Sequence, residues 1–176
     1  MALKNGEAVY ITAGIYKGRR IMTPRAGTHP MGARERIALF NMIGNNLLDF
    51  AVLDAYAGSG ALGLEALSRK AAYAVFIEKN RAAAEVIKTN IKTLGRDDVV
   101  EVCPVSKYSD DEEYNLVLAD PPYDKFDLEE VLHLVQFVAE NGIFVLSHPG
   151  NAPEIPGLKL WKSNQYAGAT ISIYHK

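Results

Sequence analysis

The chain has 176 residues, of which 48% are hydrophobic and 23% charged, as in soluble globular proteins. That length suits one domain, and no apolar run approaches the roughly 18 residues of a membrane span. The N-terminal residues lack the apolar core of a signal peptide, and the single Cys103 cannot form an internal disulfide. These features exclude a membrane-embedded or disulfide-stabilised protein and favour a cytoplasmic one.

The net charge of −2 is unevenly distributed along the chain. Residues 1–40 hold seven basic and two acidic side chains, a balance of +5, so the remaining residues carry −7. A basic segment on an acidic body indicates an anionic partner, although a solvated basic surface explains the charge equally well. The candidates for contacts with the phosphates of such a partner are Lys17, Arg19, Arg20, Arg34 and Arg36.

The first predicted elements form an N-terminal extension over residues 1–46. Two short strands around a glycine-containing turn are predicted within residues 9–23, then a loop, then a helix over 33–46. This extension is not a clear second domain, so we expect a single domain over residues 1–176.

The core of the predicted domain, residues 47–176, alternates strands with helices. This alternation predicts an α/β fold, a mainly parallel sheet with helices on both faces, closed by a C-terminal antiparallel hairpin that turns near Ala167–Gly168. The predicted elements are a strand, glycine turn and helix over 51–70, a strand over 73–78, a helix over 80–95, strands over 99–103 and 114–120, a helix over 128–142 ending at Gly142, a strand over 143–148 and the hairpin over 158–176.

A glycine turn, "LDAYAGSG", joins the first core strand to its helix. Gly58 and Gly60 permit backbone conformations that other residues avoid and let a ligand approach the main chain. Together with Gly63 they match the letters of the G-x-G-x-x-G dinucleotide pattern, which is a weak signal alone.

Two acids near this turn disfavour a nicotinamide dinucleotide. Asp54 precedes the turn, where it would repel a pyrophosphate and attract an ammonium group. Glu78 ends the next strand, where a carboxylate binds ribose hydroxyls. S-adenosylmethionine has an ammonium group, a ribose and no phosphate, so it satisfies both acids. A tight strand–helix turn with a capping acid is the alternative.

The predicted strand over 114–120 ends in Asp120-Pro121-Pro122-Tyr123. Ligands of an open parallel sheet bind outside the carboxyl ends of its strands, so Asp120 should face the same crevice as Asp54 and Glu78. The Asp120 carboxylate and the Pro121 carbonyl can accept from the N–H bonds of an exocyclic amino group and direct its lone pair toward a methyl donor. The prolines fix the backbone, and Tyr123 can stack on the base. The pattern favours amino-directed methyl transfer over a rigid turn.

Several segments, taken in order, resemble one known family. They are "AGIYKGRRI", "LFN", "LDAYAGSGALGLEALSR", "FIEKNR", "ADPPY" and "QYAGATISIY". The chain is similar over nearly its whole length to the bacterial 16S ribosomal RNA (guanine-N2)-methyltransferases of the RsmD type. The resemblance implies a class I methyltransferase fold, S-adenosylmethionine as donor and a guanine of small-subunit rRNA as target, either in 16S rRNA or in an assembling 30S subunit.

The resemblance also assigns roles to residues. The catalytic motif is Asp120, Pro121, Pro122 and Tyr123, and Asp120 also lies near the donor. The family pattern is absent at His29-Pro30-Met31, at Ile37 and at Pro104, which has no N–H for the adenine of the donor, so Val105 is expected to supply one. The donor-binding positions are then Asp54, Ala55, Tyr56, Gly58, Ser59, Gly60, Glu78, Lys79, Val105 and Asp120.

Other kinds of site have little support in the sequence. The four histidines and one cysteine lack metal-ligand spacing, and Ser59 does not stand in a nucleophile-elbow motif. We expect no metal, no membrane contact and a monomer. Two alternatives remain open, a DNA adenine or protein amino methyltransferase and a non-catalytic, RNA-binding relative.

Overall fold

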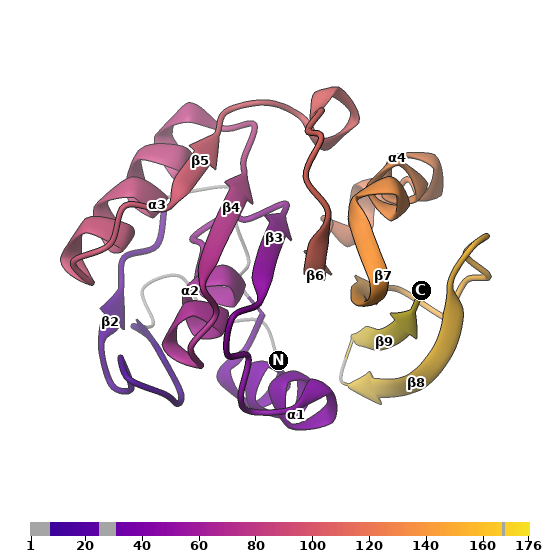
Figure 1. The fold of residues 1–176 in the computed structure, drawn as a ribbon, viewed down its shortest axis with the longest axis horizontal. Helices are drawn as coiled ribbons and strands as arrows, with labels where there is room; N and C mark the ends of the chain where they lie inside the picture. The colour runs from indigo at the N-terminus through magenta and orange to yellow at the C-terminus, as the bar shows by residue number, and fades with distance from the viewer. Residues whose placement is uncertain (1–7, 25–30, 167) are drawn as a thin grey trace.

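The computed structural model describes residues 8–24, 31–166 and 168–176 of the chain. The central element is a seven-stranded sheet in the order β5-β4-β3-β6-β7-β9-β8 (Figure 1). Its strands are β3 (Ala51–Ala55), β4 (Tyr73–Ile77), β5 (Val99–Glu101), β6 (Tyr114–Ala119), β7 (Val138–His148), β8 (Lys159–Tyr166) and β9 (Ala169–His175).

The strands β3 to β7 run parallel, and β9 pairs antiparallel with both β7 and β8. This pattern confirms the predicted α/β fold with a terminal antiparallel hairpin. The predicted turn residue Ala167 lies outside the described residues, and β8 and β9 meet on either side of it at the pair Tyr166 and Ala169.

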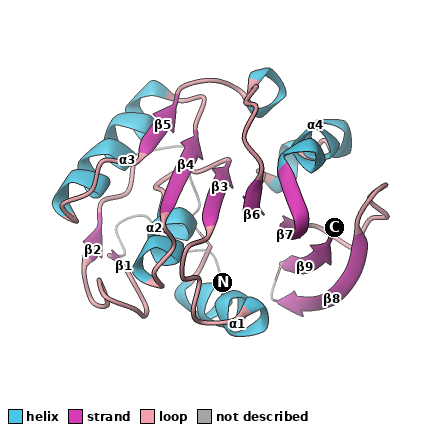
Figure 2. Cartoon of the chain, in the orientation of Figure 1, coloured by secondary structure: helices cyan, strands magenta, loops and turns pink. Residues whose placement is uncertain are grey.

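Helices cover both faces of the sheet (Figure 2). One face packs against α1 (Ala33–Ile43), α2 (Ala61–Ser68) and α3 (Arg81–Thr93), and the other against α4 (Leu128–His133) with the 3-10 turns η1 (Val105–Lys107) and η3 (Leu134–Phe137). Successive residues of a strand face opposite sides, so Val52 joins the first core and Leu53 the second. Both faces of the central strands β3, β4 and β6 are buried, so these strands are mostly apolar, whereas the edge strands β5 and β8 are largely exposed.

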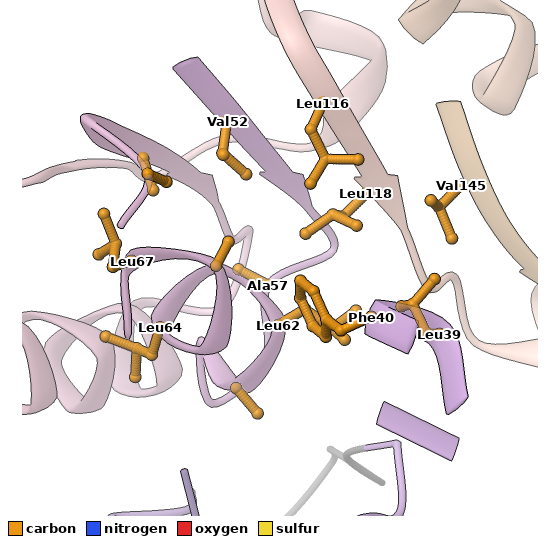
Figure 3. Packing of buried hydrophobic residues seen from close by; sticks show 14 of the residues in the cluster. Leu39, Phe40, Val52, Ala57, Leu62, Leu64, Leu67, Leu116, Leu118 and Val145 are labelled. Carbon is orange, nitrogen blue, oxygen red and sulfur yellow. The ribbon is translucent and has the colours of Figure 1, made fainter. Parts of the chain in front are cut away.

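The N-terminal elements share the first of these cores. A two-stranded antiparallel sheet, β1 (Val9–Tyr10) and β2 (Arg20–Ile21), places Val9 and Ile21 in the same cluster as Val52. Figure 3 shows Leu39 and Phe40 of α1 beside Leu118 of β6 and Val145 of β7. The extension therefore packs directly on the centre of the sheet. No helix within the described ranges is long and apolar enough to cross a membrane.

The predicted helix over 128–142 is wrong in its second half. The helix α4 ends at His133, one 3-10 turn follows, and β7 begins at Val138 instead of Ile143. Val138 pairs with Tyr114 of β6, and the register of the two strands then shifts before Ile143 pairs with Leu116. Asn141, within this irregular part of β7, has a φ of 60°. The apolar spacing of this segment fits a helix. The pairing of Val138 with Tyr114, which is distant in the sequence, instead makes it a strand. The predicted strand over 99–103 also ends earlier, at Glu101.

Candidate active site

The glycine turn is a tight loop with three residues in the left-handed region of backbone space. Tyr56 has a φ of 61°, Gly58 of 57° and Gly60 of 78°. Gly60 is the N-cap of α2 and donates its N–H to the Ala57 carbonyl at 2.7 Å. The first turn of α2 thus begins immediately at the end of β3, with its N-terminal N–H groups at the carboxyl edge of the sheet.

Glu78 ties this loop to the start of α3. Its carboxylate accepts from the N–H of Gly58 at 2.8 Å and from the N–H of Asn80 at 2.7 Å. Asn80 in turn caps α3 by accepting from Ala82 and Ala83. Glu78 is 9% exposed, so its carboxylate lies at the boundary between the core and the edge of the sheet.

Asp54 lies beneath the loop, enclosed by protein. It is 1% exposed, and one of its oxygens accepts from the N–H of Gly63 at 2.8 Å. Gly63 must be a glycine here, because a Cβ atom would lie 2.3 Å from the Phe76 ring and 3.0 Å from the Asp54 carboxylate. The third glycine of the pattern therefore permits the close approach of α2 to β4.

Asp120 follows β6 and is partly buried. Removal from water raises the pKa of Asp120 to about 6, although a hydrogen bond from the Ser147 hydroxyl opposes the rise. Pro121 is buried, Pro122 is exposed, and Tyr123 is 38% exposed. The Tyr123 hydroxyl lies 2.5 Å from the Ser147 Oγ, so the aromatic ring is attached to the end of β7.

The three predicted carboxylates interact electrostatically. Burial raises the pKa of Asp54, the Gly63 hydrogen bond opposes that rise, and the negative charges of Asp120 and Glu78 add to it. The structure thus brings the acids of β3, β4 and β6 to one edge of the sheet. This arrangement attracts a cation and repels a phosphate.

The remaining donor-binding candidates have varied surroundings. Ala55 is buried at the end of β3, Lys79 is exposed, and Val105 is buried at the start of η1. Ser59 is 2% exposed, and its hydroxyl oxygen has no hydrogen-bond partner. Tyr56 donates its hydroxyl to Glu130 of α4 at 2.9 Å.

Four of the five basic candidates lie at the surface, and one does not. Arg36 is 1% exposed, and its guanidinium donates to the carbonyls of Met31 and Tyr10 at 2.7 and 2.8 Å. Its Nε lies 3.9 Å from the buried Glu65 carboxylate. The prediction that Arg36 meets RNA phosphates is therefore wrong, because its charge is enclosed within the protein. Lys17, Arg19, Arg20 and Arg34 are exposed.

Comparison with known proteins identifies the family. A family model described as "Conserved hypothetical protein 95", which is the RsmD family, matches residues 9–175. The chain belongs to the RsmD family. It is 39% identical over 132 residues to the ribosomal RNA small subunit methyltransferase D of Escherichia coli K12, covering 73% of this chain and 67% of that protein.

Two further relatives match the RsmD-family chain over almost its full length. The Bacillus subtilis protein YlbH is 30% identical over 185 residues, covering 94% of this chain and 98% of its own. The solved structure of the Escherichia coli protein yhhF is 30% identical, with a TM-score of 0.86 and coverage of 97% of this chain and 98% of its own. The fold of this RsmD-family member is that of the class I methyltransferases.

Three residues beside the candidate site of this RsmD-family chain are not predicted by any motif or spacing in its sequence. Ser147 meets Asp120 and Tyr123, and Glu130 binds the Tyr56 hydroxyl and the Ser106 N–H. Asn90 of α3 is buried and bonds the backbone of Met22 and the carbonyl of Ser59. Each acts through partners distant in sequence. In the described part of the chain, no group of His, Cys, Asp and Glu residues could hold a metal ion. The departures His29 and Pro30 lie outside the described residues.

Proposed function

We propose that this chain transfers a methyl group from S-adenosylmethionine to an exocyclic amino group of a base, most specifically N2 of a guanine in 16S rRNA of the small ribosomal subunit. The observation that carries the proposal is the meeting of Asp54, Glu78 and Asp120 at one sheet edge, with Asp120 leading into Pro-Pro-Tyr. The name of the Escherichia coli relative supports the choice of small-subunit rRNA.

The residues around the glycine loop fit the donor. Glu78 would hold the ribose hydroxyls, and Asp54 would attract the ammonium group. The Ser59 hydroxyl has no hydrogen-bond partner in the protein and is thus available to a bound donor. A Cβ at Gly60 would lie 3.2 Å from the Ile87 side chain, so a glycine there lets the loop pack closely on α3. Val105 and Lys79 complete the proposed site. S-adenosylmethionine, when bound, supplies an electrophilic methyl group.

The chain's own residues position the acceptor. An oxygen of Asp120 and the carbonyl of Pro121 would accept from the two N–H bonds of the target amino group, so that its lone pair is directed along one line. A pKa of about 6 keeps Asp120 ionised, and hence an acceptor, above neutral pH. Tyr123 would stack on a base that has left its helix.

The exposed basic residues extend this site toward RNA. Lys17, Arg19, Arg20 and Arg34 would bind phosphates and fix the orientation of the substrate without reading its sequence. The start of α1 lies near the catalytic motif, since the charge of Glu35 acts on the Tyr123 hydroxyl. A substrate whose backbone rests on the N-terminal elements can therefore present a base at Asp120.

Methylation of 30S particles that lack the modification tests the proposal. We expect labelled methyl from S-adenosylmethionine to appear on a guanine N2 of 16S rRNA in mass mapping, and Asp120→Ala, which removes the acceptor oxygens, to reduce the transfer rate steeply. Free 16S rRNA, DNA and protein substrates are incubated in parallel. Methylation of DNA or protein instead of RNA would support the enzyme alternative, and RNA binding without transfer to any substrate would support the non-catalytic one.

A further inference from the structure

Ser147 contacts both residues of the proposed catalytic motif that have polar side chains, Asp120 and Tyr123. Ala119 of β6 pairs with Leu146 of β7, so Asp120, which follows β6, lies next to Ser147 of β7. Ser147 is 1% exposed, its Oγ lies 2.5 Å from the Tyr123 hydroxyl, and its hydroxyl hydrogen-bonds the Asp120 carboxyl.

The polarity of this chain of hydrogen bonds follows from the donors available. A serine hydroxyl has one proton and two lone pairs, and an ionised carboxylate can only accept. Ser147 therefore donates to Asp120, which leaves Tyr123 to donate its hydroxyl proton to Ser147. In this arrangement a single buried hydroxyl stabilises the ionised form of Asp120 and holds the Tyr123 ring.

We propose that Ser147 is a positioning residue for methyl transfer, which holds the Asp120 carboxyl and the Tyr123 ring side by side through one hydroxyl. The proposal rests on the proposed function of the site. It also changes the role of the Tyr123 hydroxyl, because base stacking alone needs only the ring, whereas the structure gives the hydroxyl a partner of its own.

Few other groups near Asp120 could stabilise its ionised form. Asp54 on β3 and Glu35 on α1 are acidic side chains, so neither offers a positive charge to Asp120. Burial lowers the pKa of His148, which follows Ser147, so its ring is neutral near pH 7. None of the ion pairs formed within the described residues includes Asp120. Within the described residues, the Ser147 hydroxyl is the group whose hydrogen bond favours the Asp120 carboxylate.

The first test needs no substrate. NMR titration of the Asp120 carboxyl carbon in the free protein should place its pKa about one pH unit higher in Ser147→Ala than in the wild type, because the variant loses a hydrogen bond to the charged form. Ser147→Thr, which keeps the hydroxyl, should restore the wild-type value. If Ser147→Ala does not fold, Ser147→Cys offers nearly the same volume with a weaker donor, and the same direction is expected.

Ser172→Ala is the matched control. Ser172 is also a buried serine, on the adjacent strand β9, but its hydroxyl bonds His148 at 2.8 Å and Ser163 at 2.9 Å. Its replacement should leave the Asp120 titration unmoved. An unchanged pKa of Asp120 in Ser147→Ala, or an equal shift in Ser172→Ala, overturns the proposal even if the chain methylates no RNA.

The second test uses single-turnover methyl transfer as a function of pH. Relative to wild type, Ser147→Ala should lose about fivefold more rate at pH 6 than at pH 9, the ratio expected when the pKa of Asp120 moves from about 6 to one unit higher. Donor affinity should stay within a few-fold. A loss that is equal at every pH indicates a structural role only and contradicts the proposal, whereas absence of transfer by the wild type contradicts the proposed function instead.

Discussion

The three carboxylates at the sheet edge differ in their partners, and the partners determine what each can do. Asp54 is buried, and one of its oxygens accepts a hydrogen bond from a backbone N–H. Glu78 accepts from two backbone N–H groups on either side of the strand end. Asp120 meets a side-chain hydroxyl, whose proton can reorient. Three side chains of similar type thus have different surroundings, and in the proposed function these surroundings separate donor binding from chemistry.

Glu78→Ala should weaken the binding of S-adenosylmethionine. A hydrogen bond to a charged group is worth about 1.5–3 kcal/mol, so the affinity should fall roughly tenfold to a hundredfold. Isothermal titration calorimetry measures this loss. Glu78→Gln keeps the volume and one acceptor oxygen, so its affinity should lie between those of the wild type and Glu78→Ala.

The same substitution removes the partner of the Gly58 and Asn80 N–H groups, so loop stability must be measured separately. Glu101→Ala, at the exposed end of the neighbouring strand β5, is the control and should bind the donor normally. Wild-type donor affinity in a folded Glu78→Ala protein would remove Glu78 from the site.

At the scale of elements, the contact between α2 and β4 can be tested at one glycine. Alanine normally stabilises a helix interior relative to glycine by about 0.5–1 kcal/mol. At Gly63 the added carbon would lie 2.3 Å from the Phe76 ring, and overpacking of this kind costs about 1–3 kcal/mol. We therefore expect Gly63→Ala to lower the urea midpoint of unfolding. A raised midpoint would mean that α2 can move away from β4 without cost.

The N-terminal hairpin and α1 should govern the salt dependence of RNA binding. Reversing the charges of Lys17, Arg19 and Arg20 should reduce the slope of log affinity against log salt concentration by up to about one for each phosphate that the variant no longer neutralises. Filter binding at several salt concentrations measures the slope. Reversal of the exposed Lys92 and Lys159, on α3 and β8, is the control for a general change in charge. Equal slopes for the two sets of variants would contradict a directed interaction.

The sequence predicts local features of these elements well and distant partners poorly. The glycine turn and the strands β3, β4 and β6 follow from apolar runs and turn residues next to one another in the chain. The strand start at Val138 depends on Tyr114, and the burial of Arg36 depends on Glu65, neither of which lies nearby in sequence. The contact of Ser147 with Tyr123 can be found only when β7 is placed beside β6.

At the scale of the whole molecule, a buried polar network joins the N-terminal elements to the helix that follows the glycine loop. Glu65 of α2 is 0% exposed and accepts from the Thr12 N–H and hydroxyl and from the Ala13 N–H at 2.6–3.0 Å. Arg69, one turn later, forms an ion pair with Glu65 at 2.9 Å and lies over the Phe40 ring. The N-terminal elements are thus anchored to α2, and the chain should unfold as one unit.

Glu65→Gln should destabilise the entire chain and not only its N-terminal part. The substitution keeps the volume but leaves the buried guanidinium groups of Arg36 and Arg69 without a carboxylate. Removal of one partner of a buried ion pair lowers the free energy of unfolding by about 3–5 kcal/mol. Urea unfolding should be followed by the fluorescence of the single Trp161, in β8, and by far-ultraviolet circular dichroism, which reports the helices. Because the extension supplies Val9, Ile21 and Phe40 to the shared core, both signals should shift together to lower urea. Glu85→Gln, in an exposed pair with Lys88, should leave both midpoints in place. A loss of helix signal that precedes the change at Trp161 would instead mean that the N-terminal elements detach first, and that the sheet is stable without them.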